Sequence, residues 1–155
     1  MESRVGAGST FRVLLPVAPA EPEEEPVKCL TPHRGRILVV DDEPLVGGVM
    51  QRTLGGEFDV VSVTSGPAAL ARLRAGERYD LVFCDLLMPG MTGVELHAEL
   101  GRLDPALAGR MVFLTGGAFT PTTQAFLSRP GVEFIEKPFE LEAIRAAIAR
   151  RLDRS

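Results

Sequence analysis

Short apolar runs alternate along this chain with segments whose apolar residues recur every three or four positions. A short apolar run is typical of a buried strand, and the wider spacing is typical of an amphipathic helix. From residue 36 onward the alternation predicts five strand–helix units. The predicted strands are 36–41, 58–63, 80–85, 110–115 and 132–137, and the predicted helices are 44–54, 67–76, 92–103, 121–128 and 140–152.

Five alternating units with nearly continuous apolar strands predict an α/β fold, in which one parallel sheet is covered by helices on both faces. An open sheet of this kind has a point where the strand order reverses. Ligands bind at that point, outside the carboxyl ends of the strands. Functional side chains are therefore expected directly after the strands.

The segment 18–35 interrupts the pattern, because it is rich in proline and glutamate. Such a composition cannot bury enough apolar surface to fold alone, so the segment is predicted to be a solvated linker. It separates a short N-terminal segment, 1–17, from a predicted folded domain at 36–155.

Composition narrows the class of protein. The chain has 155 residues, of which 45% are apolar and 25% charged, as in one ordinary soluble domain. A net charge of -4 and a pI near 5.3 give no reason to expect nucleic-acid binding. No apolar stretch approaches the roughly 20 residues that span a bilayer, so membrane contact is not expected. Cys29 lies in the linker and Cys84 in an apolar run, which argues against a disulfide and favours a reducing, cytoplasmic compartment.

Four of the five predicted strands end in residues that carry chemistry. The first ends in the acidic run 41–43, the third in Asp85, the fourth in Thr115 and the fifth in Lys137. Crowded carboxylates need a positive partner, and oxygen ligands without His or Cys select Mg²⁺ rather than Zn²⁺. One more carboxylate can act as a nucleophile towards phosphorus, while an amine and a hydroxyl neutralise the phosphoryl oxygens. A single aspartate at a strand end could equally be a helix N-cap or a turn residue, but four strand ends together favour phosphoryl transfer.

Four motifs carry a resemblance to a known family: "ILVVDDEP", "DLVFCDLLMPGMTG", "VFLTGG" and "FIEKPF". Together they resemble the receiver domain of two-component response regulators, over about Arg36 to Leu152. The resemblance implies a flavodoxin-like, doubly wound (βα)5 fold whose five-stranded parallel sheet has the order 2-1-3-4-5.

Carried over position by position, the resemblance makes Asp85 the phosphoacceptor. Asp41 and Asp42 would form the acidic pair for Mg²⁺ together with Asp85, with Asp42 the more direct ligand of the pair. The backbone carbonyl of Leu87 would be a further ligand.

The same resemblance assigns a switch. Thr115 would be the hydroxyl that moves to meet the phosphoryl group, and Lys137 the cation that pairs with the phosphoryl oxygens. Phe134 matches the rotating aromatic residue of the family, although it could instead be a core residue of the last strand. A cis peptide is also expected between Lys137 and Pro138.

The implied function is a step of a phosphorelay, in which a phosphoryl group passes from phosphohistidine to Asp85 with Mg²⁺ and switches the conformation. A histidine kinase or a histidine phosphotransfer protein is the implied partner. A weak homodimer through the face formed by 121–128, 132–137 and 140–152 is one further partner that the resemblance allows. No separate enzyme activity is expected beyond self-catalysed phosphoryl transfer.

Two other functions share part of this pattern. A pseudo-receiver would act only as a protein-binding module, but such domains usually lack the acceptor, the acid pair or the lysine, and all are present here. A phosphatase that uses an aspartyl phosphate would need a second Asp where Leu87 stands.

The N-terminal stretch "GAGSTFRVLLPVAPA" has a resemblance of its own, to the last glycine-rich box and strand of a histidine-kinase ATP-binding domain. This implies that 1–17 are a remnant of such a domain and that the chain is the C-terminal receiver of a hybrid sensor histidine kinase. The alternative is a tag or a flexible tail. No DNA-binding or enzymatic output module is expected after residue 155.

A few positions depart from the simple pattern. Gly47 and Gly48 fall inside a predicted helix, where each costs roughly 1 kcal/mol relative to alanine; tolerated drift is favoured over a close approach. His33 and His97 are predicted to be solvated. Leu87 and Gly117 stand where a polar side chain could orient a water, which predicts slow loss of the phosphoryl group.

Overall fold

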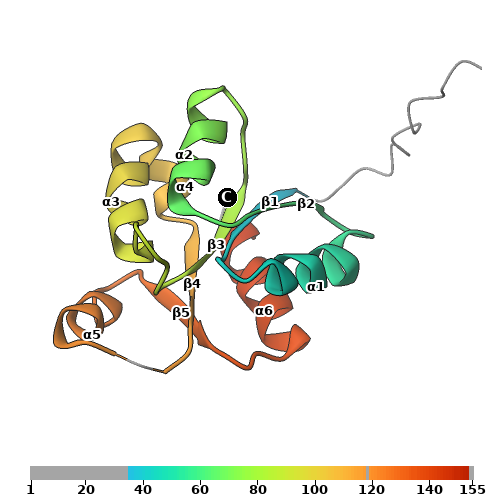
Figure 1. The fold of residues 1–155 in the computed structure, drawn as a ribbon. Helices are drawn as coiled ribbons and strands as arrows, with labels where there is room; N and C mark the ends of the chain where they lie inside the picture. The colour runs from blue at the N-terminus through green and yellow to red at the C-terminus, as the bar shows by residue number, and fades with distance from the viewer. Residues whose placement is uncertain (1–34, 118, 154–155) are drawn as a thin grey trace, which may run out of the picture. The chain divides into compact units, whose positions relative to one another are not determined.

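The computed structural model describes residues 35–117 and 119–153, which form a single α/β domain (Figure 1). The predicted N-terminal segment 1–17 and all of the predicted linker 18–35 except Gly35 lie outside the described residues. The strands are β1 (Arg36–Val40), β2 (Asp59–Val63), β3 (Leu81–Asp85), β4 (Met111–Thr115) and β5 (Glu133–Glu136). The helices are α1 (Pro44–Leu54), α2 (Gly66–Arg74), α3 (Gly93–Leu103), α4 (Pro105–Ala108), α5 (Pro121–Leu127) and α6 (Leu141–Leu152).

The five strands form one parallel sheet in the order β2-β1-β3-β4-β5, which confirms the predicted flavodoxin-like fold. The order reverses between β1 and β3, so the carboxyl ends of these neighbouring strands flank the point where a ligand site is expected.

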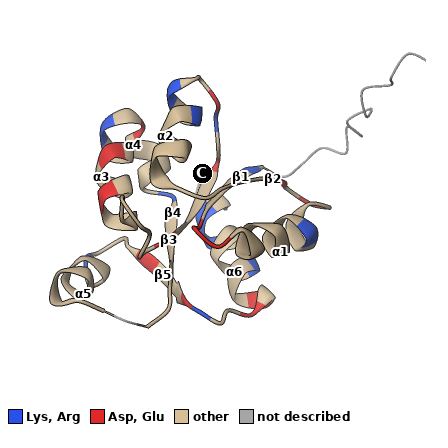
Figure 2. Ribbon diagram, in the orientation of Figure 1, with Lys and Arg blue, Asp and Glu red and all other residues tan. Residues whose placement is uncertain are grey.

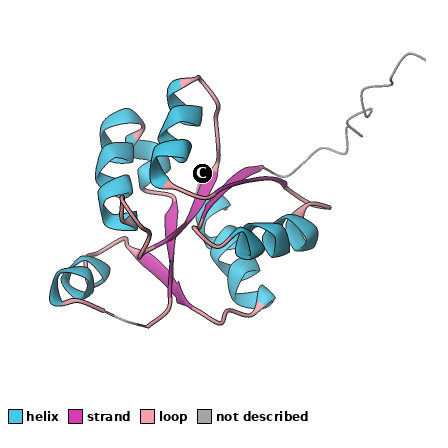
Figure 3. Cartoon of the chain, in the orientation of Figure 1, coloured by secondary structure: helices cyan, strands magenta, loops and turns pink. Residues whose placement is uncertain are grey.

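Helices lie on both faces of the sheet (Figure 3). Two clusters of buried apolar side chains, one on each face, hold them there. On one face, α1 and α6 bury Met50, Leu54 and Ile144 against Ile37 and Val39 of β1. On the other face, α2 to α5 cover side chains such as those of Leu38 and Val40, which alternate with the first set along the same strand. All residues of β3 and β4 are buried, because both strands are central and covered on both faces.

The structure adds one helix to the predicted pattern. The short α4 begins where α3 ends, because the carboxylate of Asp104 accepts a hydrogen bond from the N–H of Leu107 and Pro105 occupies the first turn. The predicted capping box of Thr92 and Glu95 at the start of α3 is confirmed.

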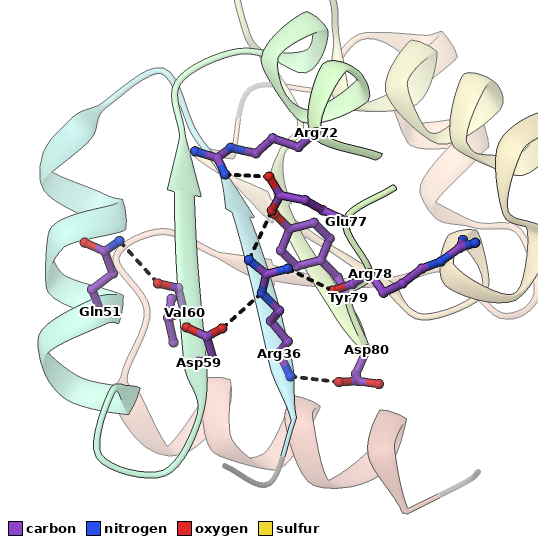
Figure 4. A network of polar contacts seen from close by, with 9 residues as sticks. All are labelled: Arg36, Gln51, Asp59, Val60, Arg72, Glu77, Arg78, Tyr79 and Asp80. Carbon is purple, nitrogen blue, oxygen red and sulfur yellow. Dashed lines mark hydrogen bonds and ion pairs between the residues drawn. The ribbon is translucent and has the colours of Figure 1, made fainter. Parts of the chain in front are cut away.

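A polar network fixes the amino edge of the sheet (Figure 4). The guanidinium of Arg36 donates to Asp59 at 3.0 Å and to Glu77 at 3.1 Å, and its carbon lies 4.7 Å from the ring centroid of Tyr79. The backbone N–H of Arg36 donates to Asp80 at 2.7 Å. The first residue of β1 is thereby tied to β2 and to the segment that precedes β3.

Among the described residues, no helix combines the length and the apolar character that crossing a membrane requires.

Candidate functional site

The predicted site residues meet at the carboxyl edge of the sheet. Asp41 directly follows β1, Asp85 ends β3 and Thr115 ends β4, while Lys137 directly follows β5. Because β1 and β4 both pair with β3, the first three positions are brought to neighbouring strand ends. Figure 2 shows the acidic loop that joins β1 to α1 at this edge.

Three carboxylates and one amine form the centre of the site, which we call the acidic cluster: Asp41, Asp42, Asp85 and Lys137. One oxygen from each carboxylate lies within 4.8 Å of the other two. The Nζ of Lys137 lies 2.7 Å from Asp41 Oδ2 and 3.6 Å from Asp85 Oδ1. The cluster thus contains three carboxylates and one amine, and of these three the amine contacts only Asp41 and Asp85. A bound cation could therefore balance the excess negative charge.

The two acids after β1 differ in what they bind. Asp41 is buried, and its two oxygens accept hydrogen bonds from the N–H of Glu43 at 2.9 Å and from Lys137 at 2.7 Å. Asp42 is exposed, and the described residues offer its carboxylate no hydrogen bond. Asp42 and Asp85 therefore have more oxygen lone pairs available to a metal than Asp41 has, and oxygen donors without His or Cys fit Mg²⁺.

The electrostatics of Asp85 reflect this crowding. Burial raises the pKa of Asp85 to about 6, and the Lys137 charge opposes this rise. The charge of Asp41 raises the pKa further, the backbone N–H of Leu87 lowers it by hydrogen bonding, and the charge of Asp42 raises it again. Burial would lower the pKa of Lys137, but its hydrogen bond to Asp41 and the charges of Asp41 and Asp85 raise it overall.

The turn after β3 holds Asp85 against the start of α3. The N–H of Gly93 donates to the carbonyl of Leu86 at 3.0 Å. A Cβ on Gly93 would lie 2.6 Å from the backbone oxygen of Asp85, closer than real contacts allow. The glycine of "MPGMTG" therefore permits a close approach between helix and strand end. Sequence reasoning missed this role, although a glycine at the first position of a capped helix is a visible signal.

Thr115 is 1% exposed, and its hydroxyl oxygen accepts a hydrogen bond from the N–H of Gly117 at 3.2 Å. Gly117 has a φ of +85°, which favours glycine at this position. Thr115 lies one position beyond the register partner of Asp85, which is Leu114. The predicted switch hydroxyl is therefore next to the predicted acceptor strand and is held by a local turn.

Phe134 is 41% exposed, so the alternative that it is a core residue is wrong. Its ring centroid lies 6.3 Å from that of Phe119, which is also partly exposed, in an edge-to-face arrangement. Its predicted role as a switch residue stays a prediction. The predicted cis peptide between Lys137 and Pro138 is confirmed.

Two other expectations need correction. A Cβ on Gly47 would lie 1.8 Å from the Oγ of Ser62, so this glycine is required by the packing of α1 on β2 and is not drift. Gly48 has no such neighbour. His97 is partly buried and not solvated, because its ring packs against Phe113 and Phe126.

A family model described as the response regulator receiver domain matches residues 37–149. The chain belongs to this family.

Two relatives and one solved structure illustrate the similarity. The DNA-binding response regulator MtrA of Mycolicibacterium smegmatis is 35% identical over 123 residues, which are 79% of this chain and 52% of MtrA. The sensor kinase CckA of Brucella abortus is 29% identical over 167 aligned positions, which cover 99% of this chain and 17% of CckA. The chain thus spans about half of MtrA and a smaller part of CckA.

The solved structure is that of the response regulator TrrA from Thermotoga maritima in complex with Mg²⁺ and BeF. It superimposes with a TM-score of 0.62 at 27% identity, over 74% of this chain and 96% of TrrA.

Proposed function

We propose that this receiver domain accepts a phosphoryl group on Asp85 and that a phosphohistidine of a partner protein is the donor. The observation that carries the proposal is the geometry of the acidic cluster, in which the Asp85 carboxylate lies 3.6 Å from Lys137 and within 4.8 Å of the oxygens of Asp41 and Asp42. A structural ion pair would not need three carboxylates around one amine.

In the proposed reaction, an oxygen of Asp85 attacks phosphorus, the P–N bond to the histidine breaks, and its electron pair stays on the imidazole, which takes up a proton. The amine of Lys137 lies close to both Asp41 and Asp85. It can therefore stay paired with the negatively charged phosphoryl oxygens while the phosphoryl group is transferred to Asp85. The hydroxyl of Thr115 would donate a hydrogen bond to a phosphoryl oxygen after a small movement, which is the proposed switch.

Mg²⁺ is the proposed cofactor, with Asp42, Asp85 and the backbone carbonyl of Leu87 as ligands and Asp41 as the supporting acid. When bound, it supplies positive charge to the phosphoryl oxygens. Two observations support this: the cluster has an excess of carboxylates, and the related TrrA structure is a complex with Mg²⁺ and BeF.

A titration with beryllofluoride and Mg²⁺ tests the proposal, followed by changes in the amide NMR spectrum. We expect saturable changes at Asp85, Thr115 and Lys137 that require both components. Asp85→Asn keeps the shape of the side chain but is a poor nucleophile and ligand, so it should abolish the response and leave no labile phosphate after treatment with acetyl phosphate. If Asp85→Asn responded as strongly as the unaltered protein, Asp85 would not be the acceptor. If neither the variant nor the unaltered protein responded, the result would favour a pseudo-receiver.

We further propose that the chain is part of a hybrid sensor histidine kinase, acts in the cytoplasm and receives its phosphoryl group from the kinase or from a histidine phosphotransfer protein. The similarity to CckA over 99% of the chain supports this, together with the motif at 1–17 and the linker at 18–35. If the proposal holds, the coding sequence upstream of residue 1 encodes an ATP-binding domain.

A weak homodimer through α5, β5 and α6 also stays a proposal. The exposed side chain of Phe134 on β5 favours it. Comparing the sedimentation of Phe134→Ser with that of the unaltered protein would test it.

A further inference from the structure

A cavity lies near the amino ends of β4 and β5, at the edge of the sheet opposite to the acidic cluster. It has a volume of about 300 Å³ and opens where Gly109 leads into β4 and Gly131 leads towards β5. The cavity lies beyond the C-terminal end of α5, which has seven residues and ends at Leu127; the chain then turns through Gly131 at a φ of +85° and leads to β5. In Figure 1, α5 and β5 are the two elements that this turn joins.

Three rings line the inner part of this cavity. Phe113 of β4 and Phe126 of α5 meet edge to face with centroids 5.2 Å apart, and the ring of His97 lies 5.8 Å and 5.4 Å from them. The ring of His97 is partly buried, and this burial lowers its pKa, which favours the neutral form. The inner wall is thus aromatic and uncharged.

The rim of the cavity is positive and braced. Arg151 donates to the carbonyls of Gly109 at 2.8 Å and Gly131 at 2.9 Å, and to the carboxylate of Glu133 at 2.9 Å. Arg150 pairs with the same carboxylate, so one acid is shared by two arginines. These contacts hold the two sides of the mouth at a fixed separation, as expected of a largely preformed site.

Arg129 completes the rim. Its guanidinium lies 5.4 Å from the ring centroid of Phe126, and its charge reaches His97, whose pKa it helps to lower. Within the described part of the chain, Arg129 has no carboxylate partner, and none of the residues that line the cavity is acidic. An arginine at the mouth of an aromatic cavity is suited to bind an anionic group on an apolar ligand.

We propose that this cavity binds a small aromatic carboxylate, with its ring against the apolar lining to which Met111, Phe126 and Val132 contribute and its anionic group at Arg129. The volume suits a single ring, because it lies at the lower end of the range for small-molecule sites. The ligand would contact β4, which ends at Thr115, and α5 together, so the site is placed to influence the same pair of elements that carries the proposed switch. The proposal does not depend on phosphorylation of Asp85.

Benzoate is the probe, and benzamide is its neutral counterpart of the same shape. In amide NMR spectra of the unphosphorylated chain, we expect benzoate to shift the signals of His97, Phe113, Phe126 and Gly131 in a saturable way. The dissociation constant should be on the order of 1 mM, as for other ligands of this size. Benzamide should bind at least about tenfold more weakly, because it lacks the charge that Arg129 recognises.

Arg129→Gln is the test variant, and Arg74→Gln, which alters another exposed arginine at the end of α2, is the matched control. We expect the first variant to weaken benzoate binding about tenfold and the second to leave it unchanged. The proposal is overturned if benzoate gives no saturable shifts at these residues, if benzamide binds as well, or if the two variants bind benzoate equally.

Discussion

Gly93, the first residue of α3, lets the helix approach the backbone of the proposed phosphoacceptor Asp85 closely. Gly93→Ala would place a methyl group 2.6 Å from the carbonyl oxygen of Asp85, and both partners are backbone, so one must move. We expect the free energy of unfolding to fall by about 1–3 kcal/mol and the rate of phosphorylation by acetyl phosphate to fall as well. Denaturant unfolding and phosphate incorporation measure the two effects.

Gly101→Ala is the control for this substitution, because Gly101 lies in the same helix with open space around it. Alanine should stabilise the helix there by up to about 1 kcal/mol. Equal stability changes at Gly93 and Gly101 would contradict the role given to the close approach.

Leu87 and Gly117 govern how long a phosphoryl group should persist. Hydrolysis needs a water placed in line with the P–O bond, and neither side chain can hydrogen-bond such a water. Leu87 is 43% exposed and Gly117 is exposed, so both positions border open solvent. Poor placement of a reactant can remove a large part of a catalytic effect. We therefore predict slow self-dephosphorylation, with removal of the signal left to a partner phosphatase or to back-transfer onto histidine.

The decay of the phosphorylated domain after removal of the donor measures this prediction. Leu87→Asn and Gly117→Glu should each speed the decay several-fold, because each adds a polar group that can orient water. A conservative change, Leu87→Met, should leave the rate unaltered. Unchanged decay in both polar variants would show that water placement does not limit hydrolysis.

Single residues also show where sequence reasoning succeeds and where it stops. Asp41, Asp85 and Lys137 could be predicted, because parallel strands bring their carboxyl ends to one edge and the polar residues follow directly. The need for glycine at position 47 could not, since it depends on Ser62 of another element. The burial of His97 likewise depends on rings that two other elements supply.

At the scale of elements, the apolar pattern predicted every strand and every helix except α4. That helix has four residues, which is too short to display a helical period, and its cap signals at Asp104 and Pro105 also suit a turn. The apolar pattern predicted the same degree of burial for all five strands. In the structure, β2 and β5 are partly exposed because they form the edges of the sheet. Which strand becomes an edge depends on the order in the sheet, and the residues of one strand do not specify it.

A network of polar contacts, rather than a single ion pair, holds the start of β1 in place. We therefore expect substitutions of two arginines, one inside the network and one outside it, to destabilise the fold unequally. Arg36 contacts Asp59, Glu77 and the ring of Tyr79, whereas Arg145 has one exposed partner, Glu57. We expect Arg36→Gln to lower the free energy of unfolding by about 1–2 kcal/mol and Arg145→Gln by less than about 0.5 kcal/mol. Denaturant unfolding of both variants measures the difference, and equal losses would mean that the network adds nothing beyond its separate pairs.

At the scale of the whole molecule, the acidic cluster makes stability depend on a cation. Mg²⁺ that binds the folded state alone stabilises it by about 2–3 kcal/mol at 100 times its dissociation constant, which raises the Tm by several degrees for a domain of this size. We expect this rise in thermal scans at constant ionic strength, so that general screening is equal in both samples. Asp42→Asn should lose most of the rise, since Asp42 is the exposed acid whose oxygens the protein leaves available. Its own Tm without metal should be equal or higher, because one of three crowded carboxylates becomes neutral. An equal rise in the variant and the unaltered protein would place the metal elsewhere.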